Sequence, residues 1–88
     1  MMVHFNGRLQ KETDVLLHPA NRAFRYGDGL FETIVVEVDH IRYWDDHLER
    51  MNSGCEALHL HLPHRNWQRD IQELCATSSY ARKRVKWQ

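Results

Sequence analysis

The pattern of apolar and polar residues at the start of the chain predicts a β-hairpin. Two short runs, 2–5 and 8–11, flank the dipeptide Asn6-Gly7. A two-residue type I′ turn needs positive φ at both central positions, and asparagine followed by glycine meets this need with little strain. We therefore expect strands at 2–5 and 8–11.

A long connection follows, and after it comes the most apolar run of the chain. Residues 12–29 have no sustained hydrophobic period and contain Pro19, Gly27 and Gly29, which predicts a loop with one short turn. A loop of this length inside a compact domain usually has a function. From 30 to 38 nearly every residue is apolar or β-branched, which predicts a strand covered on both faces.

A second hairpin and a helix are predicted next. We expect a turn at 39–40, a partner strand at 41–44 and then a helix with an aspartate as its N-cap. That N-cap would be Asp45 or Asp46, and the spacing from Asp46 to Glu49 is that of a capping box. The helix would therefore begin directly after the short strand.

Apolar residues recur at three- and four-residue steps along this helix, so one of its faces should pack on a sheet. The residues of this stripe are Leu48, Met51, Cys55, Leu58 and Leu62. Pro63 would end the helix, and a second helix is expected at about 65–78. Its inward positions would be Trp67, Ile71, Leu74 and Cys75. The last stretch, 81–88, alternates weakly and is a further candidate strand.

These elements predict an α+β fold, an antiparallel β-sheet with two helices packed on one face. Side chains alternate across a strand, so Phe31, Thr33 and Val35 share one face of the strand predicted at 30–38. The even-numbered residues from 30 to 36 share the other face, Glu32 among them. Only one of these two sets can face a pocket.

Composition and charge narrow the class of protein. A chain of 88 residues forms one domain with a thin core, and its twelve basic residues balance twelve acidic ones, so no overall field attracts nucleic acid or an anionic membrane. No apolar run approaches the ~20 residues that span a bilayer, and the first residues do not resemble a secretion signal. Cys55 and Cys75 are expected to be reduced and buried, as in a cytoplasmic protein.

Two motifs carry candidate chemistry. One is the stretch "NRAFRYGDGLFETI" at 21–34, and the other is "HLERM" at 47–51. From the residues alone, Arg50 is either a solvated helix residue paired with Asp46 or Glu49, or a ligand for an anion. A guanidinium is well suited to the second role because it stays charged and meets phosphate oxygens with two donors at once.

Taken together and in this order, the hairpin, the two motifs and the helix resemble the N-terminal domain of the class IV aminotransferases. These are the fold-type IV pyridoxal-phosphate enzymes, which include branched-chain and D-amino acid aminotransferases and aminodeoxychorismate lyase. The resemblance covers about residues 2–62 well. It implies that the fold is the small domain of such an enzyme and that the cofactor is pyridoxal 5'-phosphate.

The resemblance also implies roles for single residues. Arg50, in the pattern His-Leu-x-Arg-hydrophobic, would bind the phosphate of the cofactor. Tyr26, Phe31, Thr33 and Val35 would border the substrate pocket. Thr33 and Val35 stand where branched-chain aminotransferases carry a glycine and an arginine, so strict branched-chain specificity is not expected, and a lyase or another transaminase activity stays open.

Catalysis in this family needs a lysine that holds the cofactor aldehyde as a Schiff base, and it lies in a second domain. The three lysines of this chain, Lys11, Lys83 and Lys86, match no such motif. We therefore expect residues 1–88 to be the N-terminal small domain of a class IV enzyme without its lysine-bearing C-terminal domain, as a fragment, one piece of a nicked chain or a truncated gene product. Alone it should be inactive. The expected partners are that catalytic domain, a second copy in a homodimer and a small amino-acid-like substrate.

Other interpretations of the sequence stay open, and one of them is a truncated, non-catalytic interaction domain. His59, His61 and His64, with Cys55, could suggest a metal site, but the chain has no Cys-x-x-Cys pair and we assign no metal ligands. A basic stretch at 82–86 with aromatic residues beside it is a candidate for nucleic-acid binding. A charged, solvated edge strand explains the same residues, and we expect no nucleic-acid partner.

Overall fold

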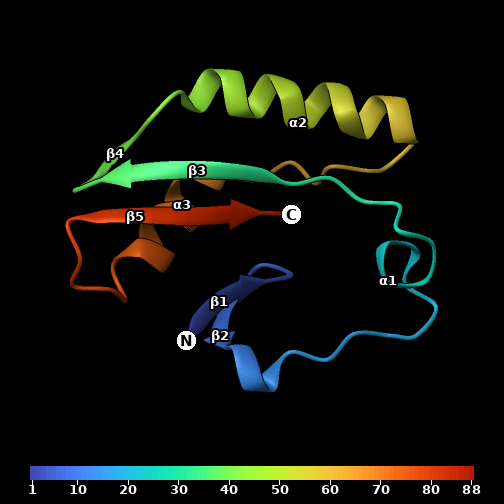
Figure 1. The fold of residues 1–88 in the computed structure, drawn as a ribbon, viewed down its shortest axis with the longest axis horizontal. Helices are drawn as coiled ribbons and strands as arrows, with labels where there is room; N and C mark the ends of the chain where they lie inside the picture. The colour runs from blue at the N-terminus through green and yellow to red at the C-terminus, as the bar shows by residue number, and fades with distance from the viewer.

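The computed structural model describes residues 1–88 as an α+β fold in which helices cover one face of an antiparallel sheet (Figure 1). The predicted fold class is confirmed. The strands are β1 Met2–Phe5, β2 Arg8–Lys11, β3 Glu32–Glu37, β4 His40–Ile41 and β5 Arg82–Trp87. The helices are η1 Glu12–Asp14, α1 Arg22–Tyr26, α2 Trp44–Leu58 and α3 Trp67–Cys75. Three strands form the main sheet in the order β4-β3-β5, and β1 pairs with β2 separately.

The first hairpin has the predicted strands and turn. Met2 pairs with Lys11 and Phe5 pairs with Arg8. Asn6 and Gly7 take φ values of 49° and 82°, the positive values that a type I′ turn needs. The Asn-Gly dipeptide therefore sets the register of this hairpin.

The connection from 12 to 31 contains more structure than the single turn that we predicted. It includes η1 and the short helix α1. The side-chain oxygen of Asn21 accepts hydrogen bonds from the backbone N–H groups of Ala23 and Phe24, and Gly27 ends the helix with φ of 71°. Asparagine at the N-cap and glycine in the left-handed region after the last turn explain the bounds of α1.

β3 is covered on one face only, so the prediction of a strand buried on both faces is wrong. The side chains of Ile34 and Val36 are 0% exposed, whereas Thr33 is exposed. The predicted alternation of faces is thus confirmed. β5 pairs antiparallel with β3 and confirms the candidate strand at the end of the sequence. Both long helices lie on the face of Ile34 and Val36, which leaves the Thr33 face open.

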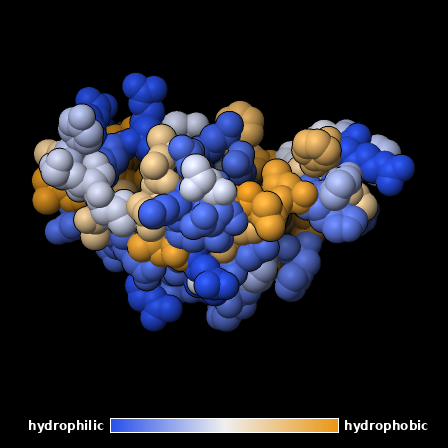
Figure 2. Space-filling view, turned by 90° about the horizontal axis from the view of Figure 1, so that it is seen from below, coloured by the Kyte–Doolittle hydropathy of each residue, from blue (hydrophilic) through white to orange (hydrophobic).

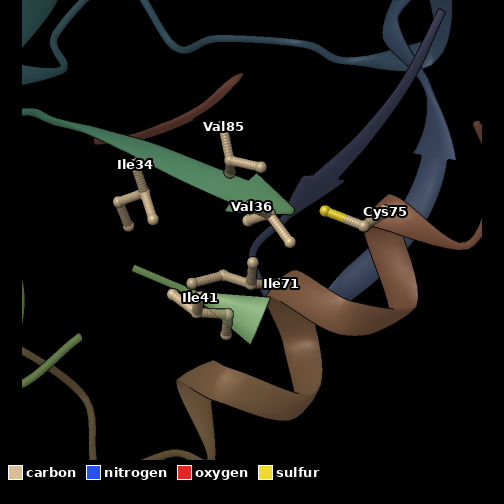
Figure 3. Packing of buried hydrophobic residues seen from close by; sticks show 6 residues of the cluster. All are labelled: Ile34, Val36, Ile41, Ile71, Cys75 and Val85. Atoms are coloured by element: carbon tan, nitrogen blue, oxygen red, sulfur yellow. The ribbon is translucent and has the colours of Figure 1, made fainter. Parts of the chain in front are cut away.

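Buried side chains from β3, β4, β5 and α3 form the hydrophobic core (Figure 3). Its members are Ile34, Val36, Ile41, Ile71, Cys75 and Val85. Next to this core the ring of Trp87 lies between two others, with centroid distances of 5.5 Å to Trp44 and 5.3 Å to Trp67. Trp87 therefore joins the end of β5 to the first turns of both long helices.

The second hairpin and the start of α2 differ from the prediction. The turn is at Val38-Asp39, one residue early, and β4 has only two residues. Tyr43, in a left-handed conformation with φ of 55°, is the N-cap and provides no side-chain hydrogen bond. Asp45 is in the first helical turn, where a carboxylate still interacts favourably with the helix dipole.

The ends and the buried positions of the long helices also refine the prediction. α2 ends at Leu58, because His59 takes φ of 56°, so Leu62 lies beyond the helix. Met51 and Cys55 are buried as predicted, but His47 is buried with them. α3 is shorter than predicted, and Asp70 is a buried position that apolar periodicity did not reveal.

The N-terminal hairpin meets the rest of the protein through α3. Asp70 is 6% exposed and accepts two hydrogen bonds from Arg65, Nε to Oδ2 at 2.8 Å and Nη2 to Oδ1 at 3.1 Å. His4 of β1 places its Nε2 3.6 Å from the same carboxylate. The Asp70 carboxylate therefore connects α3 to His4 of the hairpin and to Arg65.

Hydrophobic and hydrophilic side chains are interspersed on the surface. In the space-filling view, hydrophobic groups reach the surface between hydrophilic ones (Figure 2). Nine large hydrophobic side chains are exposed, and those between 16 and 31 are Leu16, Leu17, Phe24, Tyr26 and Phe31. None of the helices has the length and apolar character that crossing a membrane requires.

Candidate functional site

Glu32, His47 and Arg50 form a hydrogen-bonded cluster where α2 lies beside the start of β3 (Figure 1). His47 and Arg50 are three residues apart on α2, so their side chains share one side of the helix. Glu32 is the first residue of β3 and points toward that helix, on the same face of the strand as Ile34. Two segments far apart in sequence thus bring an acid, an imidazole and a guanidinium together.

The contact between Arg50 and Glu32 is a two-point ion pair. Nε of Arg50 donates to Oε1 at 2.8 Å, and Nη2 donates to Oε2 at 3.2 Å. The hydrogen bond from Arg50, followed by that from His47, holds the pKa of Glu32 below its ordinary value. The same bond raises the pKa of Arg50. Glu32 is therefore a carboxylate and Arg50 a cation at neutral pH.

Arg50 is fixed on one side and free on the other. Its side chain is 58% exposed, against 14% for Glu32. The hydrogen bonds of Arg50 use Nε and Nη2, so Nη1 is left for a further acceptor. A guanidinium held in this way can bind an anion with little loss of side-chain freedom.

His47 completes the cluster from the buried side. It is 7% exposed, and its Nδ1 lies 2.8 Å from Oε2 of Glu32 and 3.2 Å from Nη2 of Arg50. A carboxylate oxygen only accepts hydrogen bonds, so the short contact with Glu32 assigns a hydrogen to Nδ1. The sequence analysis gave no role to His47 or Glu32. A signal was present, since Glu32 is the one charged residue on the core-facing side of its strand.

The segment before β3 is held against the second half of α2. Leu30 packs on Gly54, where an added Cβ would lie 2.8 Å from Leu30 Cδ1. Nη2 of Arg22 donates to Asp28 Oδ2 at 3.0 Å and to the carbonyl oxygen of Leu58 at 3.5 Å. Gly54 is one helical turn beyond Arg50, so Leu30 lies close to the cluster, whereas Arg22 contacts the end of α2.

The structure does not gather all of the predicted site residues in one place. Arg50 meets β3 on the helix-covered face, whereas Thr33 and Val35 belong to the open face. Phe31 is 64% exposed, and Nζ of Lys86, the β5 partner of Thr33, lies 4.8 Å from its ring centroid. Phe31 therefore borders the open face together with Thr33 and Val35.

Tyr26 lies at the end of α1, away from the sheet strands, and its side chain is 68% exposed. Its one aromatic contact is with Arg25, whose Cζ is 5.4 Å from the ring centroid. The hydroxyl of Tyr26 makes no hydrogen bond within the chain. The hydroxyl can therefore bind a ligand, and it belongs to the segment whose residue Leu30 packs on α2.

Two hollows lie on the surface. The larger, about 560 Å³, is lined by residues of the β3–β4 turn, the start of α2 and α3, and none of the predicted site residues borders it. The smaller, about 280 Å³, is lined by Val35, Arg82, Lys83 and Arg84. It opens beside Val35, so the open face of the sheet carries a shallow basic depression.

The alternative sites find little support in the geometry. No group of three or more His, Cys, Asp or Glu side chains is placed to hold a metal ion. Trp87, one of the aromatic residues beside the basic stretch, is packed between Trp44 and Trp67. The Arg82 side chain is 72% exposed and lies 3.8 Å from Glu37, as a solvated edge strand predicts.

Comparison with known proteins identifies similar sequences. Residues 29–88 match the model of the amino-transferase class IV family. The chain is 37% identical over 43 residues to aminodeoxychorismate lyase of Vibrio harveyi, a match that covers 49% of this chain and 16% of that protein. It is 34% identical over 59 residues to aminodeoxychorismate lyase of Bacillus subtilis (strain 168), covering 67% of this chain and 20% of that protein. The matches thus span a fifth or less of the length of these relatives.

Proposed function

We propose, because this chain belongs to the amino-transferase class IV family, that it is the N-terminal part of a pyridoxal 5'-phosphate enzyme and that Arg50 binds the phosphate of the cofactor. The observation that carries this proposal is the state of the Arg50 side chain. It is anchored to Glu32 through two nitrogens, and it is more than half exposed with Nη1 free. An anion can therefore approach a guanidinium that is already oriented.

The donor chemistry of the cluster fits a phosphate group. Arginine remains charged at every working pH, and the two N–H groups of the free Nη1 can donate to phosphate oxygens. Glu32 and His47 would act as positioning residues, since they hold Arg50 from the protein side and leave its outer edge to the ligand. When bound, pyridoxal phosphate supplies an electron sink for the reacting carbon of the substrate.

The substrate wall is proposed to lie around the open face. Phe31 and Val35 offer apolar area and Thr33 offers a hydroxyl at the rim of the sheet, while Tyr26 brings a second hydroxyl on a segment tied to α2. The substrate would be a small amino-acid-like molecule. Both relatives are aminodeoxychorismate lyases, which favours a lyase reaction over amino-group transfer.

The complete enzyme needs partners that residues 1–88 do not supply. We place the Schiff-base lysine in a catalytic domain outside these residues, and we propose a homodimer as the working assembly. The exposed side chains of Phe24 and Phe31 offer apolar area that such an assembly could cover.

The test is binding of a cofactor analogue that cannot react with lysines. We choose 4'-deoxypyridoxine 5'-phosphate, which keeps the phosphate and lacks the aldehyde, and follow amide chemical shifts by NMR. The shifts should centre on Arg50 and Glu32, and the Arg50→Gln variant should bind at least about tenfold more weakly, since a charged hydrogen-bonded pair is lost. Arg69→Gln, at an exposed position of α3, is the matched control. Equal binding by the Arg50→Gln and wild-type chains would refute the assignment.

A further inference from the structure

The charge of Arg50 is already balanced within the protein. Glu32 faces it at 2.8 Å and 3.2 Å through both carboxylate oxygens. With a neutral His47, the cluster of Glu32, His47 and Arg50 has no net charge. A dianion that approaches Nη1 therefore meets a guanidinium whose field is largely cancelled by the carboxylate behind it.

His47 can supply the missing positive charge. Its Nδ1 hydrogen is directed to Glu32, and its Nε2 makes no hydrogen bond within the chain, so a second proton can be added at Nε2 without breaking a contact. An added proton would give the cluster a charge of +1. Imidazole is the side chain whose charge ordinarily changes near neutral pH.

We propose that His47 takes up a proton when a phosphate-type dianion binds Arg50, so that anion binding at this cluster is coupled to protonation of His47. The proposal rests on the function proposed above for Arg50. It makes His47 a positioning residue that also tunes the charge of the site. Anion affinity should then fall as the pH rises from acidic to alkaline values.

The charged groups around His47 are compatible with this coupling. Glu32 of β3 favours the imidazolium, and Arg50 of the same helix opposes it at 3.2 Å. Asp46 and Glu49 lie close to Arg50 and oppose anion binding. A bound dianion adds negative charge beside the cluster, which favours the protonated imidazole.

Glu32 is the other group that could accept the proton, and its surroundings argue against this. It accepts hydrogen bonds from both Arg50 and His47, and these bonds hold its pKa below the ordinary value. Protonation of Glu32 would weaken both contacts and release Arg50. The uptake of a proton by His47 keeps both in place.

The experiment uses sulfate, because its charge stays at −2 between about pH 5.5 and about pH 8 while imidazole titrates. Sulfate is added to the 88-residue chain at both pH values, and amide shifts and the His47 ring carbon shifts are followed by NMR. We expect binding about tenfold tighter at the lower pH, the effect of one added unit charge close to a dianion in a well-hydrated site. At a fixed intermediate pH, sulfate should move the His47 ring shifts toward the imidazolium values.

Two variants separate this coupling from general charge effects. The chain has seven histidines, so lowering the pH raises its net charge everywhere. His47→Gln should remove most of the tenfold difference, and His61→Gln, at an exposed position after α2, should retain it. If His47→Gln does not fold, the ring shifts of wild-type His47 decide the question alone.

Each outcome has a distinct meaning. Sulfate binding at Arg50 with no change in the His47 ring shifts would overturn the coupling and leave the phosphate assignment intact. Retention of the full pH difference in a folded His47→Gln variant would also overturn it. Absence of any sulfate or cofactor-analogue response at Arg50 at either pH would overturn the function proposed for Arg50, and the coupling with it.

Discussion

Among single residues, Glu32 has the largest influence on the candidate site, because it fixes Arg50 and His47 at the same time. A lowered pKa means that this carboxylate stabilises the fold above the ordinary pKa of glutamate, and that the contribution is lost as the pH falls through the lowered pKa. The stabilisation by Glu32 should therefore be present at neutral pH and disappear in acid.

We predict that Glu32→Gln lowers the free energy of unfolding by about 1–2 kcal/mol at neutral pH, since a charged hydrogen bond to buried His47 is weakened. The difference from wild type should shrink as the pH falls below the ordinary pKa of glutamate, and it should be gone below the lowered pKa of Glu32. Urea unfolding at several pH values measures both quantities. A pH-independent difference would mean that the carboxylate charge is not what stabilises the cluster. Glu12→Gln, on the exposed η1 turn, is the control.

The sequence predicted Arg50 at this site but not its neighbours. The motif around Arg50 made its guanidinium a candidate anion ligand, and the alternation of the strand placed Glu32 on the face opposite Thr33. The buried face of the helix was predicted from apolar residues alone, and histidine is not one of them. The burial of His47 was therefore not expected. The sequence patterns did not predict where α2 lies along β3, because that position depends on packing between segments and not on any local pattern.

At the scale of elements, the N-terminal hairpin meets α3 through polar contacts of His4 with Asp70 and Glu73. Arg65 lies between the hairpin turn and Trp67: an added Cβ at Gly7 would be 2.8 Å from Arg65 Nη1, and Arg65 Cζ is 5.8 Å from the ring centroid of Trp67. The hairpin itself contributes none of the buried core residues. It should therefore open separately from the main sheet.

We predict that Asp70→Asn detaches the hairpin and leaves the core folded. Loss of the carboxylate leaves Arg65 and His4 without their shared partner, at a cost of about 1–3 kcal/mol. The amides of β1 and β2 should then exchange with solvent at least about tenfold faster, while those of Ile34 and Val36 keep their protection. Hydrogen exchange measured by NMR distinguishes the two groups.

Glu37→Gln is the matched control, because its ion pairs with Arg42 and Arg82 are largely exposed and should contribute little. Equal acceleration of exchange in the hairpin and in β3 of the Asp70→Asn variant would show that the hairpin and the core unfold as one unit.

The elements differ in how well local sequence specified them. Asn6-Gly7 set the first hairpin because positive φ at two consecutive residues admits few other solutions. The start of α2 was misplaced because Tyr43 takes a left-handed conformation that propensity does not favour for tyrosine. Asp45 and Asp46 have the residue type of an N-cap, but α2 begins at Trp44, before either of them. The short β3–β4 hairpin and the burial of Ile41 in the core place the start of the helix there.

For the whole molecule, the prediction that the strand at 30–38 is covered on both faces failed because apolar composition does not say how many layers a chain can build. With 88 residues, two long helices suffice for one face. The open face retains Thr33 and Val35 with the basic residues of β5, and the segment 16–31 displays its apolar side chains to solvent. Both features fit the proposal that further protein covers this domain in the assembled enzyme.

We predict that the isolated chain self-associates through segment 16–31 as its concentration rises. Five exposed apolar side chains are close together in sequence there, and covering each would contribute about 1.5–3 kcal/mol before the entropy of association is subtracted. Sedimentation velocity over a concentration series measures the effect. Phe24→Lys should shift the equilibrium toward monomer, and Tyr80→Lys, an equally exposed position outside the segment, should not. A monomer at every concentration would show that segment 16–31 does not drive self-association, and the homodimer would then have to form through the catalytic domain.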